Sequence, residues 1–499
     1  MKKRLCLLLA AVCMATLSGC GDLPAPSDPV TEPDTTTTQA EEETPQQTRR
    51  FALAYSHDDT LDPFSAKTEV NCQLTSLLYE GLTALDGAMT PQPLLAASVE
   101  QTDPTHLTVT LRSDAVFSDG SAVTPADVTA SFAAAKTSSR YQALLQNVTA
   151  ARGEKEGIRF TLAAADPNAA ACLTFPIVKA GTLTEEPAQG PIGSGVYKIK
   201  ATDTGAALTQ NKRNKTKPTY TTVTLRHLPN TAARQYALAS GDISYYFDDL
   251  SEGNNPRISG ASRPVEMNAL LYLGVNGTRG KTADPTVRRA LSALMDRTAV
   301  ATEVYAGRAT ATVQPFHPSW GAMKGLTVPA QRNLDGAITL LDEAGCKAEG
   351  GPRLELELIY STQRSDRARV ADLVRTQLEG GGVAVTITPL TEEEMRDRLK
   401  KGEYDLYLGE IRLTADHSLR PLLCGGDASV GISQSGTAAV SYRAYLSGTA
   451  TLAEFLTVFG EEMPYLPLCW RSGLAAYHRG LTTVTPSAYD PYGGLAEWK

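Results

Sequence analysis

The chain has 499 residues, which is enough for two or three domains with sizeable cores. Its hydrophobic content of 42% and charged content of 20% are ordinary for a soluble globular protein. The formal net charge is −8, and nucleic-acid binding needs a basic surface, so we expect no nucleic-acid partner.

Residues 1–19 have the pattern of an export signal. A positive start, Lys2-Lys3-Arg4, precedes the apolar run Leu5–Ala15, which is too short to span a bilayer. Leu17-Ser18-Gly19-Cys20 resembles the bacterial lipobox, in which the cysteine is lipidated and the chain is cleaved before it. We therefore expect an exported protein, lipid-anchored through Cys20 to the outer face of the bacterial cytoplasmic membrane or periplasmic. An ordinary signal peptide with a chance cysteine is the alternative.

Residues 20–50 are expected to form a disordered tether. The segment is rich in Pro, Thr, Glu, Asp and Gln, with a threonine run at 35–38 and three glutamates at 41–43. Such a composition cannot bury a core. Its simplest role is to hold the folded part away from the membrane.

Cysteine and histidine spacing gives no sign of a metal site or a catalytic site. No C-x-x-C, H-E-x-x-H or G-x-S-x-G pattern occurs, so we expect no metal, no cofactor and no enzyme activity. A hydrolase whose catalytic residues meet only in space stays open as an alternative. Export permits disulfides, but an odd number of cysteines leaves at least one thiol free in a monomer. After the signal and Cys20 are set aside, the cysteines are Cys72, Cys172, Cys346, Cys424 and Cys469.

The first predicted elements alternate between strands and helices. Phe51–Tyr55 is an apolar run typical of a strand, and Val70–Leu78 is expected to be a helix. Apolar residues at 107, 109 and 111 alternate with polar ones, which predicts a half-buried strand. Thr124-Pro125-Ala126-Asp127 predicts a helix start with the threonine as N-cap.

A series of short landmarks fills the stretch from Tyr79 to Lys136. They are Tyr79-Glu80-Gly81-Leu82, Pro93-Leu94-Leu95-Ala96, Leu111-Arg112, Phe117, Asp119-Gly120, Thr124, Asp127-Val128 and Ser131-Phe132. In this order they resemble the signature of the family 5 extracellular solute-binding proteins, which are the dipeptide, oligopeptide and nickel binding proteins of ABC importers. Further matches are Leu61-Asp62-Pro63, the segment 191–199, Arg288-Arg289-Ala290-Leu291 with Met295-Asp296-Arg297, and the segment 465–470.

The middle of the chain continues the alternation. Tyr141–Leu145 is expected to be helical and Gly157–Ala163 to be a strand. Thr222–Leu228 is a predicted strand, and Thr231–Ser240 a predicted helix that ends at Gly241. Tyr245 and Tyr246 then follow a predicted strand start. Since ligands bind outside the carboxyl ends of strands in open α/β sheets, these aromatics either wall a cleft or belong to the core.

The second half predicts one strand, two helices and then a parallel sheet. Leu270–Asn276 is a predicted strand, Asp284–Tyr305 one continuous helix, and Leu334–Ala344 a helix with a glycine C-cap. The spacing then predicts alternating strands and helices, which favours a parallel sheet with helical cover. These elements are the strands Leu354–Leu358, Val383–Ile387 and Tyr404–Leu408 and the helices Arg367–Leu378 and Glu392–Lys400. Helix Leu452–Phe459 and strand Tyr465–Trp470 follow.

The loop-rich segment from Glu410 to Gln434 holds the main ligand-binding candidates. The resemblance implies that an aspartate here contacts the α-amino group of a peptide ligand, and Asp416 is the nearest match. Glu410 stands where relatives usually have an aromatic residue. Arg412 could hold a carboxylate or phosphate with its forked guanidinium group, or be an ordinary surface arginine. Tyr55 and Trp470, on the first and last predicted strands, complete the ligand-binding candidates with Tyr245 and Tyr246.

The resemblance implies an α/β fold of the two-lobed periplasmic-binding-protein type (type II) with an extra third domain. Lobe I would comprise 51–78, 191–270 and 464–499, the extra domain 79–190, and lobe II 271–463. Two strand crossings, near 271–276 and 464–470, would act as the hinge.

The resemblance also implies a function without chemistry on the ligand. A small solute, with short peptides the expected class, would be captured between the lobes and delivered by a monomer to ABC permease subunits and their ATPases. Nickel chelates and sugars stay open as ligands. A lipid-anchored sensor and a peptide-binding chaperone stay open as functions.

Overall fold

The computed structural model describes residues 51–155, 157–183, 190–203, 205–251, 253, 256, 258–487 and 489–499. The expected signal, the lipidated Cys20 and the tether lie outside the described residues. Within the described part of the chain, no helix is both long and apolar enough to cross a membrane. The five cysteines of this part are all free thiols.

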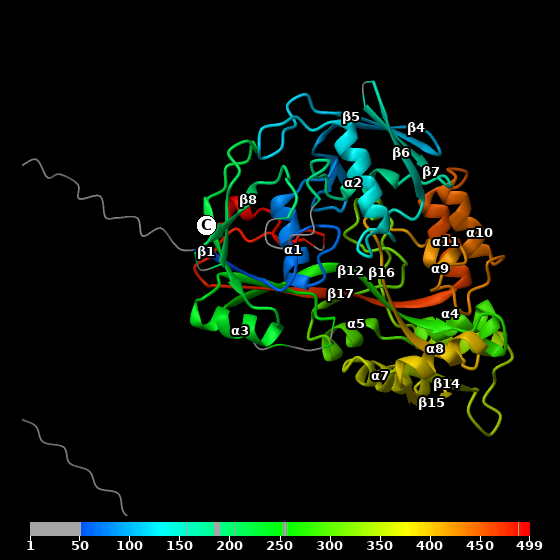
Figure 1. Cartoon of the computed structure of the whole chain (residues 1–499). Helices are drawn as coiled ribbons and strands as arrows, with labels where there is room; N and C mark the ends of the chain where they lie inside the picture. The colour runs from blue at the N-terminus through cyan, green and yellow to red at the C-terminus, as the bar shows by residue number, and fades with distance from the viewer. Residues whose placement is uncertain are drawn as a thin grey trace, which may run out of the picture. The chain divides into compact units, whose positions relative to one another are not determined.

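Two long antiparallel strands run through the middle of the molecule. They are β12 (Ala261–Val275) and β17 (Tyr465–Tyr477), and Figure 1 shows them crossing the centre side by side. They belong to an eleven-stranded sheet in the order β15-β14-β16-β12-β17-β11-β1-β10-β9-β8, in which β13 (Ala309–Ala311) also pairs with β17. The remaining strands therefore fall into two groups, one on each side of this central pair.

The group beyond β17 contains the amino-terminal strand. Strand β1 pairs in parallel with both β10 and β11, and its five residues are all buried. Leu53, Leu74 and Trp498 belong to the apolar core on this side. The elements are β1 (Phe51–Tyr55), α1 (Glu69–Leu78), β8 (Tyr197–Thr202), β9 (Gly205–Gln210), β10 (Thr222–His227), α3 (Thr231–Ser240) and β11 (Tyr245–Asp248). Helix α3 ends at Gly241, which has a φ of 82°, as the sequence predicts.

The group beyond β12 contains the predicted parallel sheet. Strand β14 pairs in parallel with β15 and β16, so this prediction is confirmed. The strands are β14 (Leu354–Ser361), β15 (Val383–Leu390) and β16 (Leu406–Arg412). The helices are α4 (Pro285–Leu294), α5 (Arg297–Ala299), α6 (Leu334–Glu343), α7 (Arg367–Glu379), α8 (Glu392–Lys401), α9 (Arg420–Leu423), α10 (Thr437–Leu446) and α11 (Leu452–Glu462). The sequence did not predict α10.

A separate antiparallel sheet carries its own core. Its order is β4-β5-β7-β6, with α2 beside it (Figure 1). The capping box of Thr124 and Asp127 starts α2 at Pro125, as predicted. The elements are β4 (Ala96–Asp103), β5 (His106–Leu111), α2 (Pro125–Thr137), β6 (Val148–Glu154) and β7 (Gly157–Leu162), with a small ribbon of β2 (Thr83–Leu85) and β3 (Pro91–Pro93) nearby.

Three sequence predictions of local structure are wrong. Asp284–Tyr305 is not one helix, because the chain is extended at Met295 and Asp296. The break lets the buried Arg297 side chain donate to the Pro467 carbonyl oxygen of β17 at 2.7 Å. Residues 141–145 form hydrogen-bonded turns instead of a helix, and β16 extends through the residues 410–412 that were expected to open a loop.

Candidate functional site

Two adjoining cavities, which we call the cleft, lie where segments from the whole chain meet. The first has a volume of about 740 Å³ and the second about 460 Å³. Helix α1, the segment after α2, strand β12, the end of β16 and the carboxyl-terminal tail all contribute to the walls. The two cavities share five lining residues: Ser76, Arg140, Met267, Arg412 and Tyr489.

A break in the central strand pair turns two residues toward the cleft. The β12–β17 register shifts between Glu266 and Ala269, so Met267 and Asn268 have no paired partner in the ladder. Met267 lines both cavities and Asn268 lines the second. Irregularities of this kind re-aim side chains and are frequent beside binding sites.

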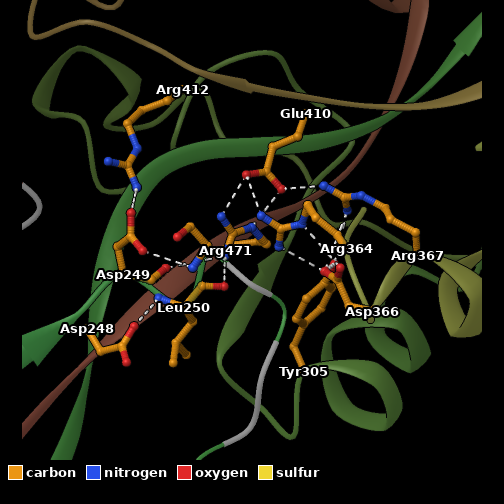
Figure 2. A network of polar contacts seen from close by, with 11 residues as sticks. Asp248, Asp249, Leu250, Tyr305, Arg364, Asp366, Arg367, Glu410, Arg412 and Arg471 are labelled. Carbon is orange, nitrogen blue, oxygen red and sulfur yellow. Dashed lines mark hydrogen bonds and ion pairs between the residues drawn. The ribbon is translucent and has the colours of Figure 1, made fainter. Parts of the chain in front are cut away.

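Arg412 is the predicted residue that the structure does place in the cleft. It is the last residue of β16, and its side chain is 51% exposed. Its guanidinium group donates to Asp249 Oδ2 at 2.9 Å, across from the loop after β11 (Figure 2). Burial alone would raise the pKa of Asp249, but Arg412 and Ser251 outweigh it and lower that pKa. Arg412 uses one of its five donors here, which leaves others for a ligand.

A second arginine, Arg140, lines the same space. It follows α2, donates to Thr75 Oγ1 at 3.1 Å, and lies with its guanidinium carbon 5.3 Å from the centre of the Tyr141 ring. Nothing in its sequence context marked it as a site residue. Two forked guanidinium groups lining one cleft form a suitable site for a carboxylate or another oxyanion.

Three carboxylates form an acidic group, and two of them, Glu69 and Asp249, line the first cavity. Oxygens of Glu69, Asp248 and Asp249 lie within 4.8 Å of one another, a spacing that could hold a metal ion. Burial and then the charge of Asp249 raise the pKa of Glu69 to about 7. Glu69 also accepts a hydrogen bond from Arg234 at 3.2 Å. An oxygen-only set suits Ca²⁺ or Mg²⁺ better than nickel.

A second group with metal-ligand spacing lies on the surface, away from the residues that line the cleft. His57, Asp58 and His227 are exposed, with His57 Nδ1 3.1 Å from Asp58 Oδ1. The backbone N–H of His57 donates to His227 Nδ1 at 3.2 Å, so that nitrogen already has a partner.

Glu410, another predicted ligand residue, is bound by arginines instead. Arg471 donates to its two carboxylate oxygens at 2.7 and 2.6 Å, and Arg367 donates at 2.7 Å (Figure 2). Burial alone would raise the pKa of Glu410, but the hydrogen bonds and charge of Arg471 outweigh it and lower the pKa to about 2. Arg471 also donates to the Leu250 carbonyl oxygen at 3.3 Å, so this network ties the loop after β11 to β16 and β17.

Asp416 lies behind the cleft wall. It is 4% exposed and accepts a hydrogen bond from the Thr414 hydroxyl. Burial and then the charge of Asp166 raise its pKa to about 6. Its chain neighbours Thr414 and Ala415 line the second cavity, whereas Asp416 itself lines neither cavity of the cleft.

The four aromatic candidates are buried and also line neither cavity of the cleft. Tyr245 donates to the Pro491 carbonyl oxygen at 2.5 Å and packs against the Trp498 ring, while Trp470 packs against His317. The other two are Tyr55 and Tyr246. In this structure, contact of any of the four with a solute would require the core to open.

The position of Asp416 gives a prediction about pH. Its pKa is about 6 when folded, against an ordinary value of 3.8, so the folded state holds a proton more tightly than the unfolded state. Stability should therefore fall as pH rises from about 4 to about 6, by up to about 3 kcal/mol from this group. Asp416→Asn removes the titration, and urea unfolding across this range should show a flatter profile. If Asp416→Asn has the same dependence of stability on pH as wild type, the raised pKa of Asp416 is contradicted.

Comparison with known proteins places the chain among solute-binding proteins. Residues 90–419 match the family described as Bacterial extracellular solute-binding proteins, family 5 Middle. The chain is similar to Protein XP55 of Streptomyces lividans, with 26% identity over 71% of this chain and 69% of the relative. It is similar to the oligopeptide-binding protein AppA of Bacillus subtilis, with 26% identity over 67% of this chain and 66% of the relative.

Solved structures share the fold. The structure of NikA from Brucella suis in complex with Fe(III)-EDTA has a TM-score of 0.69 and 21% identity, and the match covers 90% of this chain and 99% of that one. The fold is therefore the two-lobed periplasmic-binding-protein fold predicted from the sequence.

Proposed function

Because the chain belongs to the family 5 bacterial extracellular solute-binding proteins, we propose that it is the substrate-binding component of an ABC importer. It captures a small solute in the cleft and delivers it to a membrane permease without chemical change. The chain acts as a monomer, held to the membrane by a lipid on Cys20. The relative AppA, an oligopeptide-binding protein by name, supports short peptides as the solute class.

One observation carries the choice of peptides: the cleft offers both charges that a peptide's ends require. Arg140 and Arg412 line both cavities and suit the terminal carboxylate. Glu69 and Asp249 line the first cavity and suit the terminal ammonium group. A solute that binds both the two arginines and the two carboxylates competes with the existing Arg412–Asp249 ion pair.

The mechanism is closure of two lobes around the solute. The proposed lobe I is 51–78, 191–270 and 464–499, and lobe II is 271–463, with 79–190 as the extra domain. The chain passes between the lobes near 271–276, in β12, and near 464–470, where β17 begins, and these two crossings form the hinge. A solute that contacts both walls favours the closed state, because it binds that state more tightly.

A thermal-unfolding screen against short peptides, nickel chelates and sugars tests the ligand class. A true ligand at a hundred times its dissociation constant should stabilise the chain by about 2.7 kcal/mol, seen as a raised melting temperature. Peptides should give this shift. A flat response to peptides with a shift from chelates or sugars would overturn the proposed class, and no response at all would favour a sensor or another non-transport role.

A further inference from the structure

One buried polar atom without a partner belongs to the cleft wall. Ten buried side-chain nitrogen or oxygen atoms among the described residues have no hydrogen-bond partner. Nine of them belong to residues that line neither cavity of the cleft. The tenth is Oδ1 of Asn268, which lines the second cavity.

The nitrogen of the Asn268 amide is fully used. It donates to the Tyr489 hydroxyl at 2.5 Å and to His417 Nδ1 at 3.1 Å. The Asn268 backbone carbonyl accepts from the Leu413 amide at 2.8 Å, which fixes this irregular stretch of β12 against the end of β16. The side chain, 1% exposed, thus has its nitrogen satisfied and its oxygen unpaired.

The hydrogen-bond partners of the Asn268 side chain determine the orientation of its amide group. His417 Nδ1 accepts from the amide nitrogen in the neutral tautomer whose proton is on Nε2, and Nε2 has no hydrogen-bond partner of its own. The Tyr489 hydroxyl lies 3.3 Å from the Thr414 carbonyl oxygen and donates there, so it accepts from Asn268. The Tyr489 hydroxyl therefore requires the amide nitrogen of Asn268, and the amide oxygen points elsewhere.

An unpaired buried acceptor is unfavourable, and native proteins rarely keep one without a reason. Resting on the proposed function, we propose that Asn268 Oδ1 accepts a hydrogen bond from an amide or ammonium N–H of the bound solute. Oδ1 is shielded from water in this structure, so the donor reaches it as the wall adjusts around the solute. The site would then exclude solutes that cannot offer a donor at this point.

An N–H group fits this position better than a hydroxyl. Oδ1 is the single unpaired polar atom of the Asn268 side chain, and an amide N–H satisfies it with its one hydrogen. A hydroxyl would also bring an oxygen that needs its own donor in a buried place. This favours peptide-like solutes over sugars.

Isothermal titration with backbone-modified peptides tests the proposal. The probes are tri-alanine, two analogues in which one amide N–H is replaced by an ester oxygen, and one analogue without the terminal amine. Each analogue is compared with tri-alanine. For the wild-type chain, one analogue should lose about 3- to 10-fold more affinity than the other two analogues lose. Asn268→Leu should abolish that extra penalty, because the acceptor is gone.

Two further variants keep the result interpretable. Asn268→Asp retains an acceptor oxygen and should retain the penalty, even if Asn268→Leu folds poorly. Arg375→Ala removes an exposed ion pair on α7, changes no residue that lines the cleft, and should behave as wild type. Tri-alanine binding with an equal analogue penalty in wild type and Asn268→Leu overturns this inference alone. Absence of peptide binding by wild type overturns the proposed peptide ligand and this inference with it.

Discussion

Arg471→Ala should lower the free energy of unfolding by about 3–5 kcal/mol, the effect expected when one partner of a buried ion pair is removed. Arg471 is 2% exposed and donates to both oxygens of Glu410 at 2.7 and 2.6 Å. Its loss leaves a largely buried carboxylate with fewer partners, and the Leu250 carbonyl oxygen keeps only the Gly253 amide as a donor. Urea unfolding of wild type and variant at pH 7 measures the difference.

The matched control is Arg375→Ala, which removes an exposed ion pair to Asp372 three residues earlier on α7. That change should cost less than about 0.5 kcal/mol. A similar small effect for Arg471→Ala would show that the network of Figure 2 does not stabilise the fold.

The pH dependence of the same network has a defined sign. Glu410 has a pKa of about 2 when folded, against an ordinary value of 4.5. Its contribution is therefore present above about pH 4.5 and lost as pH falls toward 2. In Arg471→Ala the folded-state pKa of Glu410 should be higher, so the loss should be smaller and complete at a higher pH, which an acid-unfolding titration would detect.

Arg412→Ala should weaken peptide binding by about 10- to 100-fold, because a hydrogen bond to a charged group contributes about 1.5–3 kcal/mol. Arg412 lines both cavities, and its side chain is half exposed. Its ion pair with Asp249 lies in the open cleft, so the variant should lose less than about 1 kcal/mol of stability. Isothermal titration with a peptide from the thermal screen measures the affinity.

Two companion variants separate charge from geometry. Arg412→Lys keeps the positive charge but loses the fork, so its affinity should lie between wild type and Arg412→Ala. Asp249→Asn removes the competing partner of Arg412, and a peptide that relies mainly on its carboxylate should then bind at least as tightly as to wild type. Wild-type affinity in Arg412→Ala would remove this arginine from the site.

Local chemistry predicted many elements correctly. The Thr124–Asp127 capping box and the glycine at 241 depend on residues close in sequence, so their patterns were readable. The parallel strands β14 to β16 followed from apolar runs separated by helices. The prediction of one helix from 284 to 305 is wrong because Arg297 binds a carbonyl oxygen of β17, about 170 residues away. A local sequence pattern cannot predict such a contact.

The sequence by itself determined the family, through its ordered landmarks, and most of the secondary structure. It also pointed to the segment around Arg412. Only the tertiary structure decided which charged groups face the cleft, because that depends on partners far apart in the chain. Glu410 accepts hydrogen bonds from Arg471 and Arg367, whereas Arg140 and Asn268 line the cleft although no sequence pattern predicted it. Burial and pairing in three dimensions, not residue type, separate a ligand-binding side chain from a structural one.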